Sequence, residues 1–283
     1  MPRADPIPGE RSETDAPLTG RRIAVFEHRE LDRLGRMLEA QGAKTLRCPM
    51  VAIIDAPDAA PVQAWISRVI DMPLDDLILM TGEGLRRLRG FAARAGVEPA
   101  FRDALGKLRT ITRGPKPGQA LREIGLSPAL RVPQPTTDGV IALLVDTDLR
   151  GRRIGVQLYP EAGNRLAEFL SGAGALPDPV LPYLYVPKSD PAEIIALIGE
   201  IAAGRVDAVA FTSAAQVARL FDVAETAGEA VRLSGALAKT AVAAVGPVVA
   251  AELGRCGIAA AIMPRDTFFM KPLVSAIAEH FSG

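Results

Sequence analysis

Runs of consecutive apolar residues alternate along this chain with longer segments in which apolar residues recur every three or four positions. The runs are short and apolar throughout, as in parallel strands that are covered on both faces. The longer segments have the period of amphipathic helices. This alternation predicts an α/β fold with parallel sheets flanked by helices. The expected strands include residues 23–26, 77–80, 154–158 and 208–212, and the expected helices include residues 31–41, 84–95, 118–124, 164–172, 214–227 and 248–256.

Glycines mark the expected ends of several helices. Gly42, Gly96, Gly125, Gly174 and Gly257 each stand just past a segment with helical periodicity. A helix commonly ends in a left-handed residue, which is usually glycine because it lacks a Cβ atom. These positions therefore support the helix boundaries.

The same order of elements occurs twice in the chain. Four segments of the first half match four segments of the second half, in the same order and at offsets of 131 or 132 residues. Such a series predicts duplication of a β/α unit. It also places Thr81 opposite Thr212 and Gly114 opposite Gly246. The matched segments are residues 20–25 with 151–156, 75–88 with 206–220, 111–126 with 243–258, and 132–144 with 263–277.

The repeat predicts two similar domains joined by a two-strand linker. The segments 47–54 and 180–187 are β-like, punctuated by proline and located at matching positions of the repeat. The expected first domain is discontinuous, residues 20–50 plus 184–283, and the second spans residues 55–179. Residues 1–19 contain four prolines and mixed charge, and we expect a disordered extension there.

Composition excludes several classes of function. The 33 basic and 33 acidic residues balance, which argues against a protein that binds nucleic acid over its whole surface. Two cysteines and two histidines, all far apart in sequence, do not have the spacing of a metal site. No apolar run is long enough to span a membrane, and the first residues lack the apolar core of a signal peptide. We expect a cytoplasmic protein with no metal, membrane or nucleic-acid partner.

Several motifs together resemble the uroporphyrinogen-III synthase family. They are the opening Gly-Arg-x-Ile-Ala-Val, a Thr-Ser or Thr-Gly turn after an apolar strand, a Val-Gly-Pro turn before a helix, and a Tyr-x-x-Val-Pro segment. The resemblance covers nearly all of residues 20–281, and residues 206–220 are its strongest stretch. It implies two parallel α/β domains with the active site in a cleft between them.

The resemblance also implies an activity. Members of the family cyclise hydroxymethylbilane to uroporphyrinogen III, with loss of water and inversion of ring D, which makes them carbon–oxygen lyases of tetrapyrrole and haem biosynthesis. They use no cofactor. The implied partner is a linear polycarboxylate tetrapyrrole, and the expected state is a monomer.

Such a substrate needs hydrogen-bond donors more than it needs a nucleophile. Helix N-termini offer N–H groups without intrahelical partners and the positive end of a dipole. In an open α/β sheet they face the ligand at the carboxyl ends of the strands. The implied substrate-binding residues therefore lie in four such turns: Thr81, Gly82, Arg113, Gly114, Lys116, Thr212, Ser213, Ala214, Gly246 and Val248.

Each turn has a simpler alternative reading. Thr81 and the Thr212-Ser213 pair are also typical helix caps. Arg113 and Lys116 are also typical of solvated charges beside a turn. The hydroxyl residues that the family often carries are replaced by Gly82, Pro117 and Val248, and Glu83 adds a negative charge. These departures weaken the expectation of activity more than that of fold.

Tyr183 aligns with the linker tyrosine of the family. The resemblance implies that its phenol contacts the leaving hydroxyl or orients a pyrrole ring, and we expect it to be catalytic. The alternative is a structural tyrosine at a domain boundary. Tyr159 is a weaker candidate for substrate binding.

Charge is distributed unequally between the halves. Residues 75–125 contain ten Lys or Arg and six Asp or Glu, whereas residues 206–258 contain four and five. A basic wall would steer a polyanion. The alternative is that Arg86, Arg87, Arg89 and Arg94 only solvate a helix face.

Two other functions remain open. A regulatory protein that binds a tetrapyrrole or another ligand without turnover would use the same fold. A bilobal binding protein of the periplasmic type is disfavoured by the expected absence of a signal peptide. A Rossmann dehydrogenase is disfavoured because no Gly-x-Gly-x-x-Gly follows the first strand.

Overall fold

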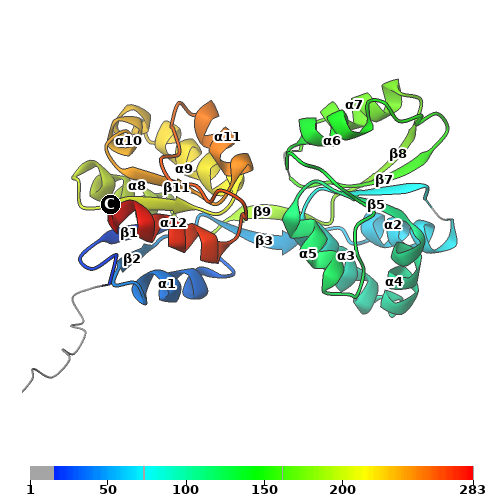
Figure 1. The fold of residues 1–283 in the computed structure, drawn as a ribbon, viewed down its shortest axis with the longest axis horizontal. Coiled ribbons are helices and arrows are strands. Elements are labelled where there is room, and N and C mark those ends of the chain that lie inside the picture. Colours follow the sequence, from blue (N-terminus) through cyan, green and yellow to red (C-terminus); the bar gives the residue numbers. More distant parts are fainter. Residues whose placement is uncertain (1–15, 73, 161, 283) are drawn as a thin grey trace, which may run out of the picture. The chain divides into compact units, whose positions relative to one another are not determined.

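The computed structural model describes residues 16–72, 74–160 and 162–282. The chain divides into two compact units (Figure 1). Unit 1 comprises residues 1–51 and 187–283, and unit 2 comprises residues 52–186. The predicted α/β class, with parallel sheets flanked by helices, is confirmed.

Unit 1 contains a four-stranded parallel sheet in the order β11-β10-β1-β2. The two central strands come from opposite ends of the sequence, and Val25 pairs with Ala210. The strands are β1 (Arg22–Val25), β2 (Lys44–Arg47), β10 (Ala208–Phe211) and β11 (Ala241–Ala244). The helices are α1 (Leu31–Glu39), α8 (Pro191–Ala202), α9 (Ala214–Thr226), α10 (Ala230–Leu237), α11 (Pro247–Arg255) and α12 (Met270–Ser282).

Unit 2 contains a five-stranded parallel sheet in the order β6-β5-β4-β7-β8. Helices α2–α5 lie on one face and α6 and α7 on the other (Figure 1). The strands are β4 (Asp76–Leu79), β5 (Arg109–Thr112), β6 (Leu130–Arg131), β7 (Arg153–Gln157) and β8 (Leu176–Val180). The helices are α2 (Ala60–Asp71), α3 (Gly82–Arg94), α4 (Glu98–Lys107), α5 (Pro115–Arg122), α6 (Thr137–Leu144) and α7 (Arg165–Gly172).

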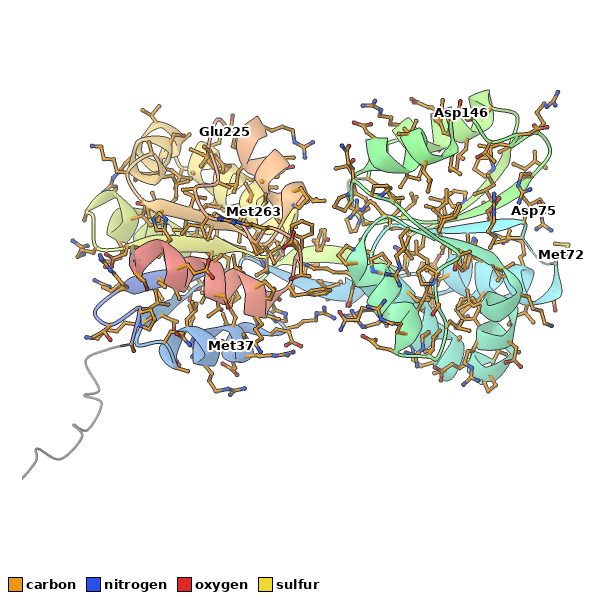
Figure 2. The ribbon with its side chains drawn as sticks, in the orientation of Figure 1. Met37, Met72, Asp75, Asp146, Glu225 and Met263 are labelled. Atoms are coloured by element: carbon orange, nitrogen blue, oxygen red, sulfur yellow. The ribbon has the colours of Figure 1, made fainter. Side chains whose placement is uncertain are left out.

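The core of unit 2 follows from the alternation of side chains along its strands. Leu77 and Leu79 join Trp65 and Phe101 in the cluster beneath α2–α5. Ile78, between them in sequence, joins the cluster beneath α6 and α7. Successive residues of a strand point to opposite faces, so a strand covered on both sides is apolar at every position. Exposed charged side chains such as Asp146 in unit 2 and Glu225 in unit 1 point away from the sheets (Figure 2).

Two strands carry the chain between the units. β3 (Val51–Asp55) and β9 (Tyr183–Pro187) form a two-stranded sheet. The N–H of Lys188 donates to the carbonyl of Met50, and the N–H of Ala56 donates to that of Pro182, so the two segments run in opposite directions. The two-strand linker expected from the repeat is therefore present.

The N-terminal segment is folded up to an earlier residue than the sequence indicated. Residues 1–15 of the expected disordered extension lie outside the described residues. Leu18, which the same expectation included, is fully buried in the core of unit 1, and its N–H donates to the carbonyl of Gln41. The apolar side chain fills a gap beside α1, which the proline-rich composition did not reveal.

The glycines expected beyond helix ends have the predicted conformation. All five have positive φ, for example 95° at Gly42 and 75° at Gly257. The helix predictions built on them are correct to within a few residues, as for α9, expected over residues 214–227 and observed as Ala214–Thr226.

Candidate functional site

Turns at the carboxyl ends of parallel strands form the candidate site in each unit. In unit 2 they follow β4, β5 and β7, and in unit 1 they follow β1, β10 and β11. Parallel strands end at the same edge of a sheet, so the turns of one unit lie along one edge. Unit 2 contains Thr81, Gly82, Arg113, Gly114, Lys116, Tyr159 and Tyr183, and unit 1 contains Thr212, Ser213, Ala214, Gly246 and Val248.

Thr81 caps α3 and is itself held by a buried glutamine. Its Oγ1 accepts a hydrogen bond from the N–H of Gly84 at 3.0 Å, which confirms the capping reading. The Thr81 N–H donates to Oε1 of Gln157 at 3.0 Å, and the Thr81 hydroxyl lies 3.4 Å from the same oxygen. Gln157 is the last residue of β7 and is fully buried. The neighbouring strand therefore fixes the turn.

The glycines of this turn make room for protein atoms. A Cβ atom on Gly82 would lie 2.6 Å from the carbonyl oxygen of Lys116, and one on Gly84 would overlap the side-chain amide of Gln157. The sequence suggested that small residues here allow a carboxylate to approach. The structure gives a different reason for them, since α5 and β7 occupy that space.

Tyr183, expected to be catalytic, contacts this turn. Its hydroxyl lies 3.1 Å from Oγ1 of Thr81, and its ring packs edge-on against Tyr185 with 5.7 Å between centroids. Only 1% of Tyr183 is exposed. Burial raises the pKa of Tyr183 well above 10, the neighbouring Tyr185 raises it further, and the Thr81 hydrogen bond opposes the shift. The phenol therefore keeps its proton at neutral pH.

The second turn of unit 2 contains a stacked arginine. The guanidinium of Arg113 lies 4.6 Å from the centre of the Tyr159 ring. Stacking leaves its N–H groups available at the edge of the planar group. Gly114 precedes α5 and lies against Pro135, since an added Cβ would be 2.9 Å from that ring. The structure thus brings Arg113 and Tyr159 together and places the Lys116 backbone beside Gly82.

The arginines of α3 are paired with carboxylates. Arg87 donates to Glu83 at 2.6 Å and to Asp55 at 2.8 Å, so the negative charge of Glu83 is compensated within its own helix. Arg94 pairs with Asp55. Arg86 and Arg89 pair with Glu123 and Glu98, respectively. These four arginines do not contribute net charge to the carboxyl edge, whose basic character rests on Arg113 and Lys116.

The equivalent turn of unit 1 uses its donors internally. Oε1 of Gln216 accepts from the N–H of Thr212 at 2.8 Å and from that of Ser213 at 3.3 Å, and Nε2 of Gln216 donates to the Thr212 hydroxyl at 2.9 Å. The Thr212 hydroxyl donates in turn to Oε2 of Glu27. Ser213 and Gln216 form a capping box at the start of α9, whose first residue is Ala214.

The last predicted turn is covered by a neighbouring loop. A Cβ atom on Gly246 would lie 2.9 Å from Phe268. Pro247 is the first residue of α11, and the N–H groups of Val249 and Ala250 both reach the carbonyl of Gly246. Val248 contributes no side-chain donor here.

The structure corrects the pairing of the repeats at one point. Thr81 was placed opposite Thr212, at an offset of 131. The N-caps of the equivalent helices are Thr81 and Ser213, and α3 and α9 have the same length at an offset of 132. One extra residue before β10 shifts the register, because Ile23 pairs with Ala208 whereas Ile154 pairs with Asp76. The pairing of Gly114 with Gly246 is correct.

Sequence reasoning missed three polar residues that organise these turns: Gln157, Gln216 and Glu27. Gln157 and Glu27 lie at the ends of apolar runs and the sequence offered one signal for them, namely a polar side chain directly after a buried strand. His28 follows Glu27, and its Nδ1 atom is buried without a hydrogen-bond partner among the described residues.

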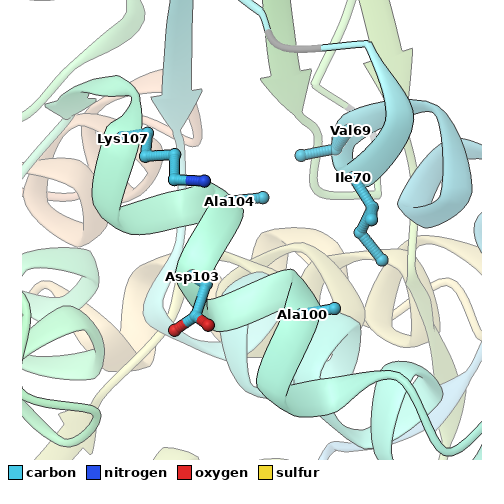
Figure 3. Close-up of a pocket in the computed structure, with 6 residues that line it drawn as sticks. All are labelled: Val69, Ile70, Ala100, Asp103, Ala104 and Lys107. Atoms are coloured by element: carbon cyan, nitrogen blue, oxygen red, sulfur yellow. The ribbon is translucent and has the colours of Figure 1, made fainter.

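A cavity elsewhere in unit 2 lies away from this edge. It has a volume of about 280 Å³ and lies between α2 and α4 (Figure 3). Both helices end shortly before β4 and β5 begin, so the cavity is near the amino ends of the strands, opposite the turns. Its lining is mainly apolar: Val69, Ile70, Ala100, Asp103, Ala104 and Lys107. Within the described residues, no three His, Cys, Asp or Glu side chains are grouped so as to hold a metal, and no helix is long and apolar enough to cross a membrane.

Comparison with known families extends over almost the whole molecule. Residues 32–275 match the model of a family described as "Uroporphyrinogen-III synthase HemD". The chain belongs to the uroporphyrinogen-III synthase family.

Relatives and solved structures agree with this family assignment. An uncharacterised protein of Bacillus subtilis, YjjA, is 31% identical over 248 residues, which are 87% of this chain and 91% of YjjA. The crystal structure of a mutant uroporphyrinogen III synthase from Thermus thermophilus is similar with a TM-score of 0.72 and 26% identity, over 92% of this chain and 98% of that one. The synthase of Helicobacter pylori, 13% identical with a TM-score of 0.50 over 92% and 99% of the two chains, shares the fold.

Proposed function

We propose that this member of the family is an active uroporphyrinogen-III synthase, which cyclises hydroxymethylbilane to uroporphyrinogen III. The observation that carries the proposal is the hydrogen bond between Tyr183 and Thr81. It places a buried, protonated phenol beside the N-terminus of α3, at the carboxyl edge of the unit 2 sheet. A family-specific tyrosine is thus held where an α/β sheet offers its ligand site.

The phenol is suited to donating a hydrogen bond to the leaving hydroxyl. Thr81 has one hydroxyl proton, and when it donates to Gln157 its oxygen accepts from Tyr183. A substrate oxygen that replaces Thr81 as acceptor draws the same proton. In the reaction the bond from carbon to this oxygen breaks, the oxygen departs as water, a carbon–carbon bond closes the ring, and a ring carbon loses a proton. The balance is loss of one water.

The carboxylates of the substrate need fixed donors. Arg113 presents a planar guanidinium on Tyr159, and such a group binds carboxylates in two-point contacts. Lys116 supplies a second cation next to the start of α5. We propose that both, with the α3 N-terminus, bind acetate and propionate groups of the substrate.

The test is a coupled assay in which enzymatically made hydroxymethylbilane is supplied to the purified protein and the product isomers are separated. We expect uroporphyrinogen III from the wild-type chain and a large loss of rate for Tyr183→Phe. Tyr185→Phe is a matched control, because Tyr185 lies in the same strand and packs on the same ring. Formation of only the non-enzymatic type I isomer would refute the proposal.

One observation favours a second function. The N–H groups of Thr212 and Ser213 are occupied by Gln216, so this turn of unit 1 offers fewer donors to a polyanion than the family pattern suggests. A regulatory protein that binds a tetrapyrrole without turnover needs only one set of such donors. Tight binding of the linear substrate, without formation of the type III isomer, would support that alternative.

A further inference from the structure

The carboxyl edge of the unit 1 sheet carries a carboxylate that the repeat does not explain. β1 ends at Val25, and Glu27 follows two residues later. β10 is the adjacent strand, with Val25 opposite Ala210, and Thr212 follows its end. Glu27 and Thr212 therefore lie side by side at the edge where α/β proteins bind ligands. The unit 2 residue that corresponds to Glu27 at the offset of 131 is the apolar Leu158.

Protein contacts hold Glu27 without neutralising it. Its Oε2 accepts from the hydroxyl of Thr212, and its Oε1 accepts from the N–H of His28 at 3.1 Å. Across residues 16–72, 74–160 and 162–282, Glu27 forms no ion pair with a lysine or arginine. Its side chain is partly exposed. A carboxylate with two hydrogen bonds and no paired cation retains its negative charge at neutral pH.

This arrangement suits a cation or an N–H donor and disfavours a carboxylate. Gln216 occupies the N–H groups of Thr212 and Ser213, and Glu27 occupies the Thr212 hydroxyl. A substrate carboxylate would meet a like charge and no available donor from these groups. A pyrrole N–H, by contrast, is a donor that a carboxylate accepts well, and the more so when the ring is positively charged.

We propose, on the basis of the proposed synthase activity, that Glu27 is a catalytic carboxylate that accepts a hydrogen bond from the reacting pyrrole N–H and stabilises its developing positive charge. When hydroxide leaves the hydroxymethyl carbon with its bonding electron pair, the positive charge spreads over the pyrrole ring to its nitrogen. Glu27 forms no covalent bond and takes no proton in this step. A fixed charge that is complementary to the transition state lowers the barrier without reorganisation.

Glu27→Gln tests this role, because glutamine has the same shape and a carbonyl oxygen that can accept from Thr212. We expect its kcat for uroporphyrinogen III to fall about a hundredfold, as on removal of one electrostatic contact, with KM unchanged or lower. The type I isomer should rise in proportion. The matched control is Glu225→Gln, which makes the same change of charge near the exposed C-terminal end of α9 and should leave kcat unaltered.

Glu27→Asp guards against a folding defect, since it keeps the charge but withdraws it by one methylene. We expect it to fold and to lose about tenfold in kcat. A folded variant of either kind with wild-type kcat contradicts the role of Glu27 while leaving the synthase activity intact. Type I product alone from the wild-type chain overturns the synthase activity itself, and the role of Glu27 with it.

Discussion

At the scale of single residues, Thr81 joins three functions in one hydroxyl group. It caps α3, contacts Gln157 and contacts Tyr183. Thr81→Val keeps the shape and removes all three hydrogen bonds. We expect a loss of about 1 kcal/mol in the free energy of unfolding, typical of a lost cap, and a further rise in the pKa of Tyr183, because the Thr81 hydrogen bond lowers it. Urea denaturation and ultraviolet titration of tyrosine would measure both. Thr81→Ser should show neither effect.

Tyr183 gives the protein a distinctive response to alkaline pH. Burial raises the pKa of Tyr183 above that of an unfolded chain, which is 10.0. The unfolded state therefore loses its proton first, and the contribution to stability, complete below about pH 10, declines as the pH rises towards the folded-state pKa. The slope approaches −1.4 kcal/mol per pH unit. Denaturation of wild type and Tyr183→Phe from pH 9 to 11 should show stabilities that converge with rising pH. A constant difference would contradict a protonated, buried phenol.

The sequence was sufficient to find residues whose role is local. Thr81 precedes its own helix, and Tyr183 stands in a recognisable segment. Gln157 was missed because its contact with Thr81 spans 76 residues and depends on the pairing of β4 with β7. Glu27 was missed for the same reason, since its partner Thr212 is 185 residues away. Contacts across strands need the register, which a shift of one residue in the repeat had already obscured.

At the scale of elements, α3 contains two glycines with opposite roles. Gly84 faces Gln157, whose amide occupies the space of a Cβ atom, whereas the nearest neighbour of a Cβ on Gly90 is the flexible end of Arg94 at 3.3 Å. We expect Gly84→Ala to destabilise by about 1–3 kcal/mol through overpacking. Gly90→Ala should stabilise by about 0.5–1 kcal/mol through helix propensity. Thermal denaturation would compare them. Combining Gly84→Ala with Gln157→Ala should recover part of the loss, and no recovery would contradict the proposed contact.

Elements with a strong period were the ones that the sequence could define. Strands β1, β4, β7 and β10 are buried runs, and their helices end at glycines with positive φ. The helices that precede strands, such as α4 and α10, were not assigned, because their apolar positions are few and their ends lack glycine. The short β6 has two residues and no pattern to detect.

At the scale of the whole molecule, the two units differ in how the chain builds them. Unit 1 needs both ends of the sequence, because β1 and β10 are central neighbours in its sheet. Unit 2 is continuous, residues 52–186, and its sheet and both of its core clusters use only residues of that span. The internal repeat indicated two equal halves, and the crossing strands redistribute them unequally along the chain.

This difference predicts how fragments behave. A chain of residues 52–186 contains its complete core, and its ends are joined through the hydrogen bond from the Ala56 N–H to the Pro182 carbonyl, 3.0 Å long. We expect this fragment to fold alone and to unfold cooperatively in denaturant, with dispersed amide resonances. The fragment 187–283 should remain unfolded, because β10 would expose the edge that β1 covers, and adding residues 16–51 in trans should restore structure. An unfolded 52–186 fragment would show that unit 2 depends on unit 1 for its stability.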